Sequence, residues 1–174
     1  MHFKSTSIPI YGLIILTLLA CSLSNTPITG EFPLAPDAPQ LPNQPSETAR
    51  VVEVIDGDTI RVRLDGEVVS VRYIGINTPE RDETCFQEAT NNNANYVENQ
   101  TVRLVTDVND TDRFGRLLRY VYVDEILVNA ELVAGGWAES RAFEPDTRLF
   151  DYLEGLEETA VRERRGCQAT SVFE

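Results

Sequence analysis

Histidine and lysine are almost absent from this chain of 174 residues. His2 is the only histidine and Lys4 the only lysine, and both stand in an N-terminal segment of the kind that is removed on export. The remaining chain would contain neither residue. This excludes Ser-His-Asp triads, histidine-bound metal hydrolases, Schiff-base lysines and the lysine of a phosphate-binding P-loop. Catalysis would have to rely on carboxylates, arginine, a metal ion or cysteine.

Residues 1–20 have the composition of an export signal. Lys4 supplies a positive charge, and residues 11–20, YGLIILTLLA, form an apolar run. The run is shorter than the about 20 apolar residues that a membrane-spanning helix needs. It ends in the string LLAC at residues 18–21, which resembles the lipobox of bacterial lipoproteins and predicts cleavage before Cys21 and lipidation of Cys21. An ordinary signal peptide with an incidental cysteine and an uncleaved anchor are the alternatives.

A proline-rich stretch follows the signal. From Pro27 to Pro45 the prolines recur at intervals of three to six residues in a polar context. Such spacing favours an extended chain without a packed core. We therefore predict that residues 21–49 are a tether and that residues 50–174 form a single domain, held outside the cytoplasm on a membrane by the lipid on Cys21. A secreted domain without an anchor is the alternative.

Acidic residues strongly outnumber basic ones. The formal net charge is −13, and it becomes −14 when Lys4 is removed with the signal. Such acidity favours solubility outside the cell. It argues against tight, non-catalytic binding to nucleic acid, which usually requires a basic face. It leaves room for an arginine-lined cleft with a bound cation.

Two cysteines, Cys85 and Cys167, remain besides Cys21. An exported protein folds where disulfides persist, so we predict that these two are bonded to each other. The bond would join the C-terminal helix to the segment after Glu80. In the chain-entropy model a loop of that length contributes ~4 kcal/mol to stability. Two free thiols or a cysteine nucleophile are the alternatives, and the nucleophile would lack a histidine to activate it.

Short runs in which apolar and polar residues alternate predict β-strands. They cover residues 50–56, 60–64, 68–74, 101–106, 117–123 and 126–128. Asp65-Gly66, between the second and third runs, is a hairpin signal.

Three helices are predicted around and after the strands. They cover residues 83–99, residues 129–134 before a Gly-Gly pair, and a final segment that begins after a cap at Asp146 or Thr147 and stops at Gly166. Many short strands followed by helices favour an α+β fold: a five-stranded, partly open β-barrel of the OB type packed by about three helices.

Acids and arginines of the kind that handle phosphodiesters lie in three short motifs. They are VIDGDTI at residues 54–60, NTPE at residues 77–80 and DRFGR at residues 112–116, with Arg72 between the first two. Acids can hold calcium, which takes oxygen ligands in flexible geometry. A guanidinium offers two parallel donors to phosphate, and a carboxylate can take the proton of an attacking water. Alone, each motif also has a plain interpretation, as a turn, a solvated strand face or a loop ion pair.

In order along the chain, the strings DGDT, RxIGIxTPE, DRxGR and VNxxLVxxGWA resemble the staphylococcal nuclease (thermonuclease) family. The resemblance runs from about residue 51 to residue 167. It implies an OB barrel, one bound calcium ion and hydrolysis of phosphodiester bonds in DNA and RNA. We expect no organic cofactor and a monomer.

The resemblance also implies a metal site. Asp58 is similar to the first calcium carboxylate of the family, and Thr78 supplies a backbone carbonyl beside the ion. Asn77 stands where the family usually has a second aspartate. An asparagine keeps a carbonyl oxygen but lacks the charge, so we expect a weakened calcium site.

Catalytic roles follow in the same way for three residues. Glu80 is similar to the general base, and Arg72 and Arg116 to the two arginines that bind phosphate. Asp112 is expected to order the loop that presents Arg116.

Two other functions remain open at this point. One is a weakened nuclease-like module that binds nucleic acid or a protein partner, which Asn77 makes possible. The other is a structural surface lipoprotein that uses the barrel only as a scaffold, which the acidic surface makes possible.

Overall fold

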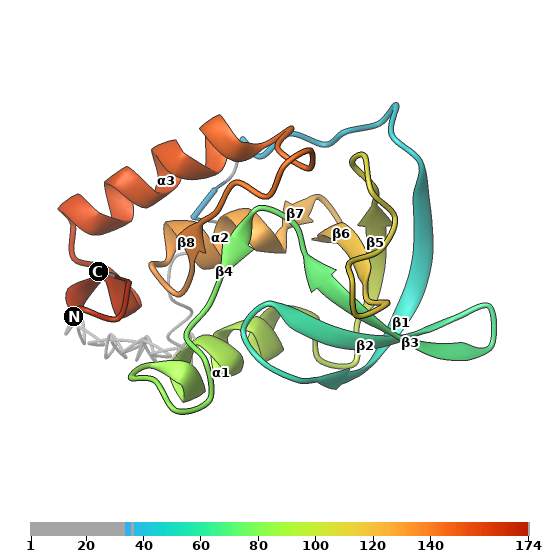
Figure 1. Ribbon diagram of the computed structural model, residues 1–174, viewed down its shortest axis with the longest axis horizontal. Helices are drawn as coiled ribbons and strands as arrows, with labels where there is room; N and C mark the ends of the chain where they lie inside the picture. The colour runs from blue at the N-terminus through green and yellow to red at the C-terminus, as the bar shows by residue number, and fades with distance from the viewer. Residues whose placement is uncertain (1–33, 36, 174) are drawn as a thin grey trace, which may run out of the picture. The chain divides into compact units, whose positions relative to one another are not determined.

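A computed structural model describes residues 34–35 and 37–173. The predicted signal segment, the cleavage site at Cys21 and the first part of the predicted tether lie outside the described residues. Everything below concerns one unit of the chain, which spans Glu31–Glu174 (Figure 1). None of the helices in the described part has the length and apolar character that a membrane crossing requires.

A closed barrel of five antiparallel and parallel strands forms the centre of this unit. The strands are β1 (Ser46–Val54), β2 (Thr59–Leu64), β3 (Glu67–Tyr73), β5 (Thr101–Val105) and β6 (Leu117–Val123). Their order is β3-β2-β1-β5-β6, and the short β7 (Ile126–Leu127) extends the sheet beyond β6. The barrel closes because β3 also pairs with β6 in parallel, with Val71 opposite Leu117. The predicted five-stranded OB-type barrel is confirmed, and it is closed.

The predicted hairpin between the second and third strands is also present. Leu64 lies opposite Glu67, so β2 and β3 are joined by the two residues Asp65 and Gly66 alone. Both have positive φ, 48° and 91°, which matches the twist that tight hairpins need and which glycine adopts without strain. Because this turn sets the register, Thr59 pairs with Arg72 at the far end of the hairpin.

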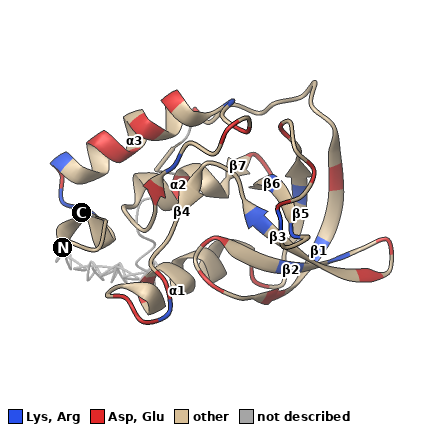
Figure 2. Ribbon diagram, viewed as in Figure 1, with Lys and Arg blue, Asp and Glu red and all other residues tan. Residues whose placement is uncertain are grey.

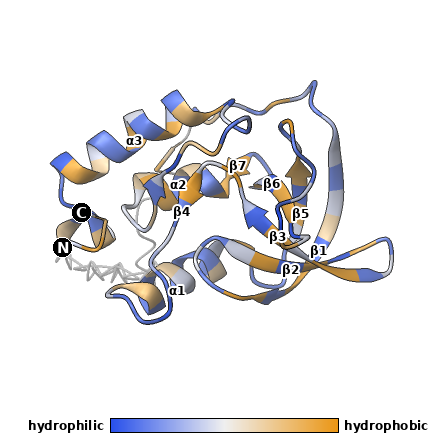
Figure 3. Cartoon of the chain, in the orientation of Figure 1, coloured by the Kyte–Doolittle hydropathy of each residue, from blue (hydrophilic) through white to orange (hydrophobic). Residues whose placement is uncertain are grey.

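Three α-helices pack on the barrel: α1 (Phe86–Val97), α2 (Val128–Ala134) and α3 (Phe150–Arg162). All residues of α2 are buried, because this helix contacts α1, α3 and β6 (Figure 1). α3 is amphipathic, and hydrophilic and hydrophobic bands alternate along it in Figure 3. Its Leu153 and Ala160 are fully buried. A 3-10 helix, η1 (Gly166–Ala169), follows α3.

Two very short strands join the barrel side of the unit to the segment before α3. β4 (Ile76–Asn77) pairs with β8 (Glu139–Ser140), and Asn77 lies opposite Glu139. The pairing brings the residues after β3 next to a segment more than 60 positions later in the chain.

The folded part begins earlier than residue 50, where the sequence predicted the domain to start. β1 begins at Ser46, and Ala35 and Ala38 are buried. The carboxylate of the buried Glu131 on α2 accepts hydrogen bonds from the backbone N–H groups of Leu34 and Ala35. Proline-rich composition predicted an unpacked tether, but backbone groups of this segment find partners on the domain.

Two of the three predicted helix starts, those of α1 and α3, were placed too early. Asp146 does not cap α3, which begins at Phe150 without a side-chain cap. Its carboxylate accepts hydrogen bonds from the backbone of Val108 and Asn109 instead. The last helix also ends at Arg162, before Gly166.

The start of α1 was also predicted too early, because residues 80–83 form a separate turn before the helix. The N–H of Glu83 donates to the carbonyl of Glu80 at 2.8 Å, and the N–H of Glu80 donates to the Glu83 carboxylate at 2.7 Å. The helix therefore begins at Phe86. Cys85, just before it, forms the expected disulfide with Cys167 of η1.

Candidate active site

The turn between β1 and β2 presents Asp58. The side chain of Asp56 accepts a hydrogen bond from the N–H of Asp58 at 3.1 Å, which fixes the turn. A Cβ on Gly57 would lie 2.7 Å from the side chain of Thr78, so only glycine allows the two segments to approach this closely. As a result, Asp58 Oδ2 accepts hydrogen bonds from both the N–H and the hydroxyl of Thr78, at 2.8 and 2.9 Å.

Arg72, at the end of β3, forms an ion pair with Asp58. Arg72 Nη1 lies 2.8 Å from Asp58 Oδ2, and the two side chains are only 13% and 7% exposed. Burial raises the pKa of Asp58 to about 6, the Arg72 charge lowers it, and the neighbouring Asp56 raises it again. The negative charge of Asp58 is therefore incompletely compensated inside the protein, and a further cation beside it would favour the carboxylate form.

Asn77 holds the other side of the Arg72 guanidinium. Its Oδ1 accepts a hydrogen bond from Arg72 Nη2 at 3.2 Å, and its Nδ2 donates to Glu139 Oε1 at 3.1 Å. The Asn77–Glu139 contact follows from the pairing of β4 with β8. Glu139 also accepts a hydrogen bond from Arg141 at 3.0 Å. Glu139 was not among the predicted site residues.

Arg116 is presented by the loop between β5 and β6, and Asp112 orders this loop. Asp112 Oδ1 accepts hydrogen bonds from the N–H groups of Phe114 and Arg116, and Oδ2 accepts one from Arg116 Nε at 2.7 Å. Burial raises the pKa of Asp112, but these hydrogen bonds outweigh it and hold the pKa below its ordinary value. Within the described part of the chain, the Nη1 and Nη2 atoms of Arg116 have no hydrogen-bond partner.

Buried charged groups fix the base of the same loop. Asp146 accepts two backbone hydrogen bonds from Val108 and Asn109, as described above, and one from the Asn109 side chain at 2.8 Å. Arg119, which is 2% exposed, donates to the carboxylate and the carbonyl of Asp110. These anchors hold the loop in place while the end of the Arg116 side chain remains available.

A cleft of about 810 Å³ brings the predicted residues together. Its wall includes Asp58, Arg72, Glu80 and Arg116, which come from four different segments. Two further predicted residues, Asn77 and Thr78, do not line the cleft but contact Arg72 and Asp58 from outside its wall. The exposed side chain of Phe114 stands at the rim.

Glu80 is exposed and reaches the cleft from the turn before α1. The two hydrogen bonds between Glu80 and Glu83 set its position. Among the described residues, the Glu80 carboxylate makes no hydrogen bond or ion pair, so it is chemically available as a proton acceptor.

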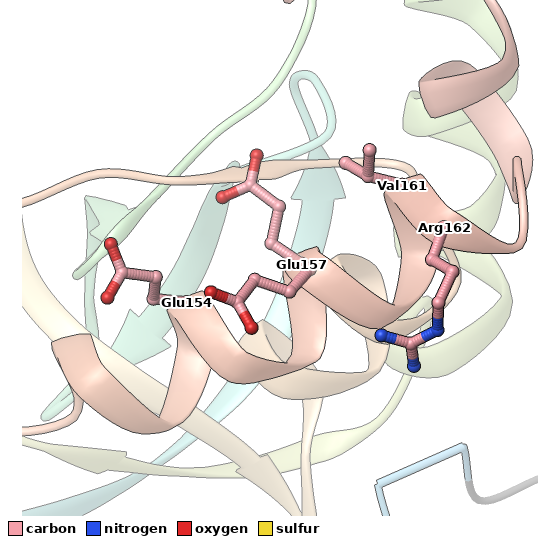
Figure 4. A pocket seen from close by; sticks show the side chains of 5 residues that line it. Glu154, Glu157, Val161 and Arg162 are labelled. Atoms are coloured by element: carbon pink, nitrogen blue, oxygen red, sulfur yellow. The ribbon is translucent and has the colours of Figure 1, made fainter.

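A second hollow lies on the outer face of α3 and has different chemistry (Figure 4). It is lined by Glu154, Glu157, Glu158, Val161 and Arg162. Glu157 is already bound to the backbone and the hydroxyl of Ser140. The hollow has a single arginine beside three glutamates, and no motif residue lies on its wall, so it does not compete with the cleft as an active site.

The oxygen atoms on the cleft wall are of the kind that bind a hard cation such as calcium. No cluster of three or more His, Cys, Asp or Glu side chains that could hold a metal occurs among the described residues. Asp56 and Asp58 nevertheless both line the cleft, and the charge of Asp56 contributes to the raised pKa of Asp58. Carboxylate and carbonyl oxygens are the ligands that calcium takes, and it tolerates irregular geometry. The oxygens present therefore fit calcium in kind.

The fold and the site together define the class of the protein: an OB barrel whose cleft carries a buried Asp–Arg pair, a second arginine and an exposed glutamate. The model of the family described as staphylococcal nuclease homologue matches residues 70–167. The chain belongs to this family.

Curated relatives agree with this assignment. The chain is 34% identical over 122 residues to a thermonuclease of Staphylococcus hyicus, covering 67% of this chain and 72% of that protein. It is 30% identical over 159 residues to a thermonuclease of Staphylococcus intermedius, covering 88% and 93%. It is 37% identical over 118 residues to the SPbeta prophage-derived endonuclease YokF of Bacillus subtilis (strain 168), covering 63% of this chain and 40% of that protein.

Proposed function

We propose that this chain is a calcium-dependent nuclease, tethered outside the cytoplasm by a lipid on Cys21. Family membership makes it a nuclease, a hydrolase of phosphodiester bonds in nucleic acid. The observation that supports the calcium-dependent activity is the cleft wall, on which Asp58, Arg72, Glu80 and Arg116 meet. The lipid tether rests on the LLAC string at residues 18–21 alone.

The two arginines would bind the phosphate from two sides. The Nη1 and Nη2 atoms of Arg116 are available, because Asp112 takes only its Nε. Such an arrangement suits two parallel hydrogen bonds to phosphate oxygens, which a lysine cannot make. Arg72 is already held by Asp58 and Asn77, so little side-chain freedom is lost when phosphate arrives.

Glu80 would act as the general base. It is exposed on the cleft and lies on a turn that its contacts with Glu83 fix. A carboxylate in such a place can take the proton of a water that attacks the phosphorus, and a general base typically contributes about 10²–10⁴-fold to a rate.

Asp58, with the side-chain carbonyl of Asn77 and the backbone carbonyl of Thr78, would hold one calcium ion. When bound, the ion would neutralise charge on the phosphate in the transition state. Incomplete compensation of the Asp58 charge supports this role. The Asn77 carbonyl accepts one hydrogen bond from Arg72, and its second lone pair would remain for the ion.

The test is degradation of DNA and RNA by the purified protein with added calcium and with a calcium chelator. We expect cleavage of at least one polymer with calcium and loss of cleavage with the chelator. A salt-dependent shift of DNA without cleavage would instead indicate a weakened binding module. Neither binding nor cleavage would indicate a scaffold.

A further inference from the structure

Three arginines share the outer face of the β1–β2 hairpin: Arg50, Arg61 and Arg63. The alternation of exposed and buried residues along β2 places Arg61 and Arg63 on the same outward face. Arg50 of β1 lies directly opposite Arg63 in the antiparallel pair. In Figure 2, where lysine and arginine are blue, blue segments lie on the β1–β2 part of the barrel.

Two of these arginines are unusual because they face each other without an acid. Like charges directly opposite on neighbouring strands destabilise a sheet. Arg61 is paired with Glu53 at 2.8 Å. In the described part of the chain, however, Arg50 and Arg63 make no ion pair or side-chain hydrogen bond, and both are exposed.

Acids are abundant in this chain, so an exposed arginine pair without one is informative. The chain has 28 acidic residues against 15 basic ones. Among the described arginines, ion pairs to acids occupy Arg61, Arg72, Arg116, Arg119, Arg141, Arg148 and Arg165. Five other described arginines also lack an ion pair, namely Arg81, Arg103, Arg113, Arg162 and Arg164. What distinguishes Arg50 and Arg63 is that they lie directly opposite each other on neighbouring strands. Solubility alone would favour an acid beside Arg50 and Arg63 rather than a second arginine.

The same face leads directly to the cleft. Arg63 pairs with Val68 of β3, Arg61 with Ser70, and Thr59 with Arg72. Side chains at alternate positions of a strand share one face, so Val68, Ser70 and Arg72 lie on the face that carries the arginines of β2. Four residues of strand separate Val68 from Arg72, which corresponds to about 13 Å.

We propose that Arg50, Arg61 and Arg63 form an arginine track that binds the phosphodiester backbone of a nucleic-acid strand whose scissile phosphate lies in the cleft. This inference rests on the proposed nuclease function and adds a second binding site for its substrate. A strand that leaves the cleft beside Arg72 would meet Arg61 first and then the Arg50–Arg63 pair. Bound phosphates would relieve the repulsion between the two opposed guanidinium groups.

A track of this kind favours long substrates. A strand long enough to reach the arginines gains contacts that a dinucleotide bound in the cleft cannot make. In an acidic protein, such local contacts also reduce the repulsion that the substrate meets on the surface. The ligand is a polyanionic strand, and its bases need no contact with the track.

The experiment uses the purified protein with Arg50→Gln and Arg63→Gln combined. Its matched control combines Arg162→Gln and Arg164→Gln, which removes the same charge from exposed positions in and just after α3. The substrates are a single-stranded DNA of about 40 nucleotides, long enough to extend past the about 13 Å between cleft and track, and a dinucleotide. Equilibrium affinity for the long strand is measured in parallel by fluorescence anisotropy in a Glu80→Gln background.

We expect the Arg50/Arg63 variant to raise the KM for the long strand about threefold to tenfold and to leave the dinucleotide unchanged. The slope of log affinity against log salt should fall by about 1.4, which corresponds to two phosphate contacts on a single strand. The control variant should change neither value by as much. Both substitutions are at exposed positions, and the thermal unfolding curves should show that each variant is folded.

Equal effects of the track variant and the control would show that only net charge matters, and would overturn the track. If the Arg50/Arg63 variant raised the KM for the dinucleotide as much as that for the long strand, the track would also be overturned. If no cleavage occurs in any protein, the nuclease proposal fails. The anisotropy measurement would then still test the track. A loss of DNA affinity in the Arg50/Arg63 variant, but not in the control variant, would support it. Unchanged DNA affinity in the Arg50/Arg63 variant would contradict it.

Discussion

Asn77 and Glu139 form a matched pair beside the cleft. The amide nitrogen of Asn77 donates to Glu139, while its oxygen holds Arg72. An aspartate in place of Asn77 would set a second carboxylate about 3 Å from that of Glu139, where like charges repel strongly. The neutral amide is therefore the residue that is compatible with Glu139.

The contact between Asn77 and Glu139 leads to a prediction about the calcium concentration that nuclease activity requires. Asn77→Asp alone should lower the calcium concentration for half-maximal activity only slightly, because Glu139 opposes the new charge. The double variant Asn77→Asp, Glu139→Gln should lower it further, by about threefold or more, since ligand charge is then added without repulsion. Calcium titrations of nuclease activity and calorimetry of calcium binding without substrate provide the measurement, with Glu139→Gln as the control. Coinciding titrations in all four proteins would show that Asn77 is not a calcium ligand.

Arg116 can be tested without changing charge. Arg116→Lys keeps the cation but loses the pair of parallel donors, so we expect turnover to fall about 100-fold, as when one donor to a developing charge is removed. Arg113→Lys, in the same loop, is the matched control and should retain most of the activity. Measured kcat in both variants decides the matter, and wild-type turnover in Arg116→Lys would remove Arg116 from the proposed mechanism.

The site residues that lie in the motifs could be identified from the sequence. The residues that hold them in place through contacts between distant segments could not. Asp58, Arg72, Glu80 and Arg116 lie in short motifs, and the structure places all four on one cleft. No sequence motif marked Glu139 as a site residue, because it contacts Asn77 only through the pairing of β4 with β8, two strands of two residues each. Asp146 was read as a helix cap because aspartate is favoured there, but two backbone N–H groups of a distant loop were better partners.

Among the secondary-structure elements, the strands were the easier to predict. The run at 117–123 coincides with β6, and the Asp65-Gly66 turn joins β2 to β3 as expected. Period-two alternation and a two-residue turn are local signals, so they survive without tertiary information. The start of β1 was missed because residues 46–49 are exposed or small, and they are held in the barrel by pairing with β5.

The disulfide connects two elements that lie far apart in sequence. Cys85 precedes α1 and Cys167 lies in η1, with a sequence separation of 82. In the chain-entropy model, replacing both cysteines by alanine should cost ~4 kcal/mol of unfolding free energy. Urea denaturation of the oxidised protein and of the variant would measure this difference.

Mass spectrometry provides the accompanying control. The non-reduced protein should be lighter than the reduced protein by two hydrogens, and the reduced wild type should unfold like the double alanine variant. Two alkylatable thiols in freshly exported protein would show that Cys85 and Cys167 are not bonded.

For the molecule as a whole, the sequence before the described residues predicts where the enzyme works. Cys21→Ser should release the protein from the membrane fraction or block its processing, because the lipid has no other acceptor in the predicted lipobox. Fractionation of cells that express both forms would measure this. Native protein that is fully soluble, with Cys21 unmodified, is the outcome that rules out the anchor.

The acidity of the chain extends to the cleft. The whole chain has a net charge of −13, and the cleft wall carries the three arginines Arg72, Arg113 and Arg116 beside six acids: Asp56, Asp58, Glu80, Asp112, Glu144 and Asp146. Two of these acids, Asp58 and Asp112, are ion-paired with Arg72 and Arg116, so the proposed calcium ion would have to offset the charge of the others before a phosphate could bind. Local placement of a few cations decides whether a polyanion can bind.

The most direct test of the cleft as a nuclease site compares Glu80→Gln with Glu83→Gln. Each change removes one exposed carboxylate charge from the same turn, and only Glu80 lines the cleft. Single-turnover hydrolysis of single-stranded DNA at saturating calcium is the measurement. We predict that Glu80→Gln lowers the rate about 100-fold or more, as loss of a general base does, and that Glu83→Gln has only a small effect. A Glu80→Gln variant that cleaves DNA at the wild-type rate would contradict the account.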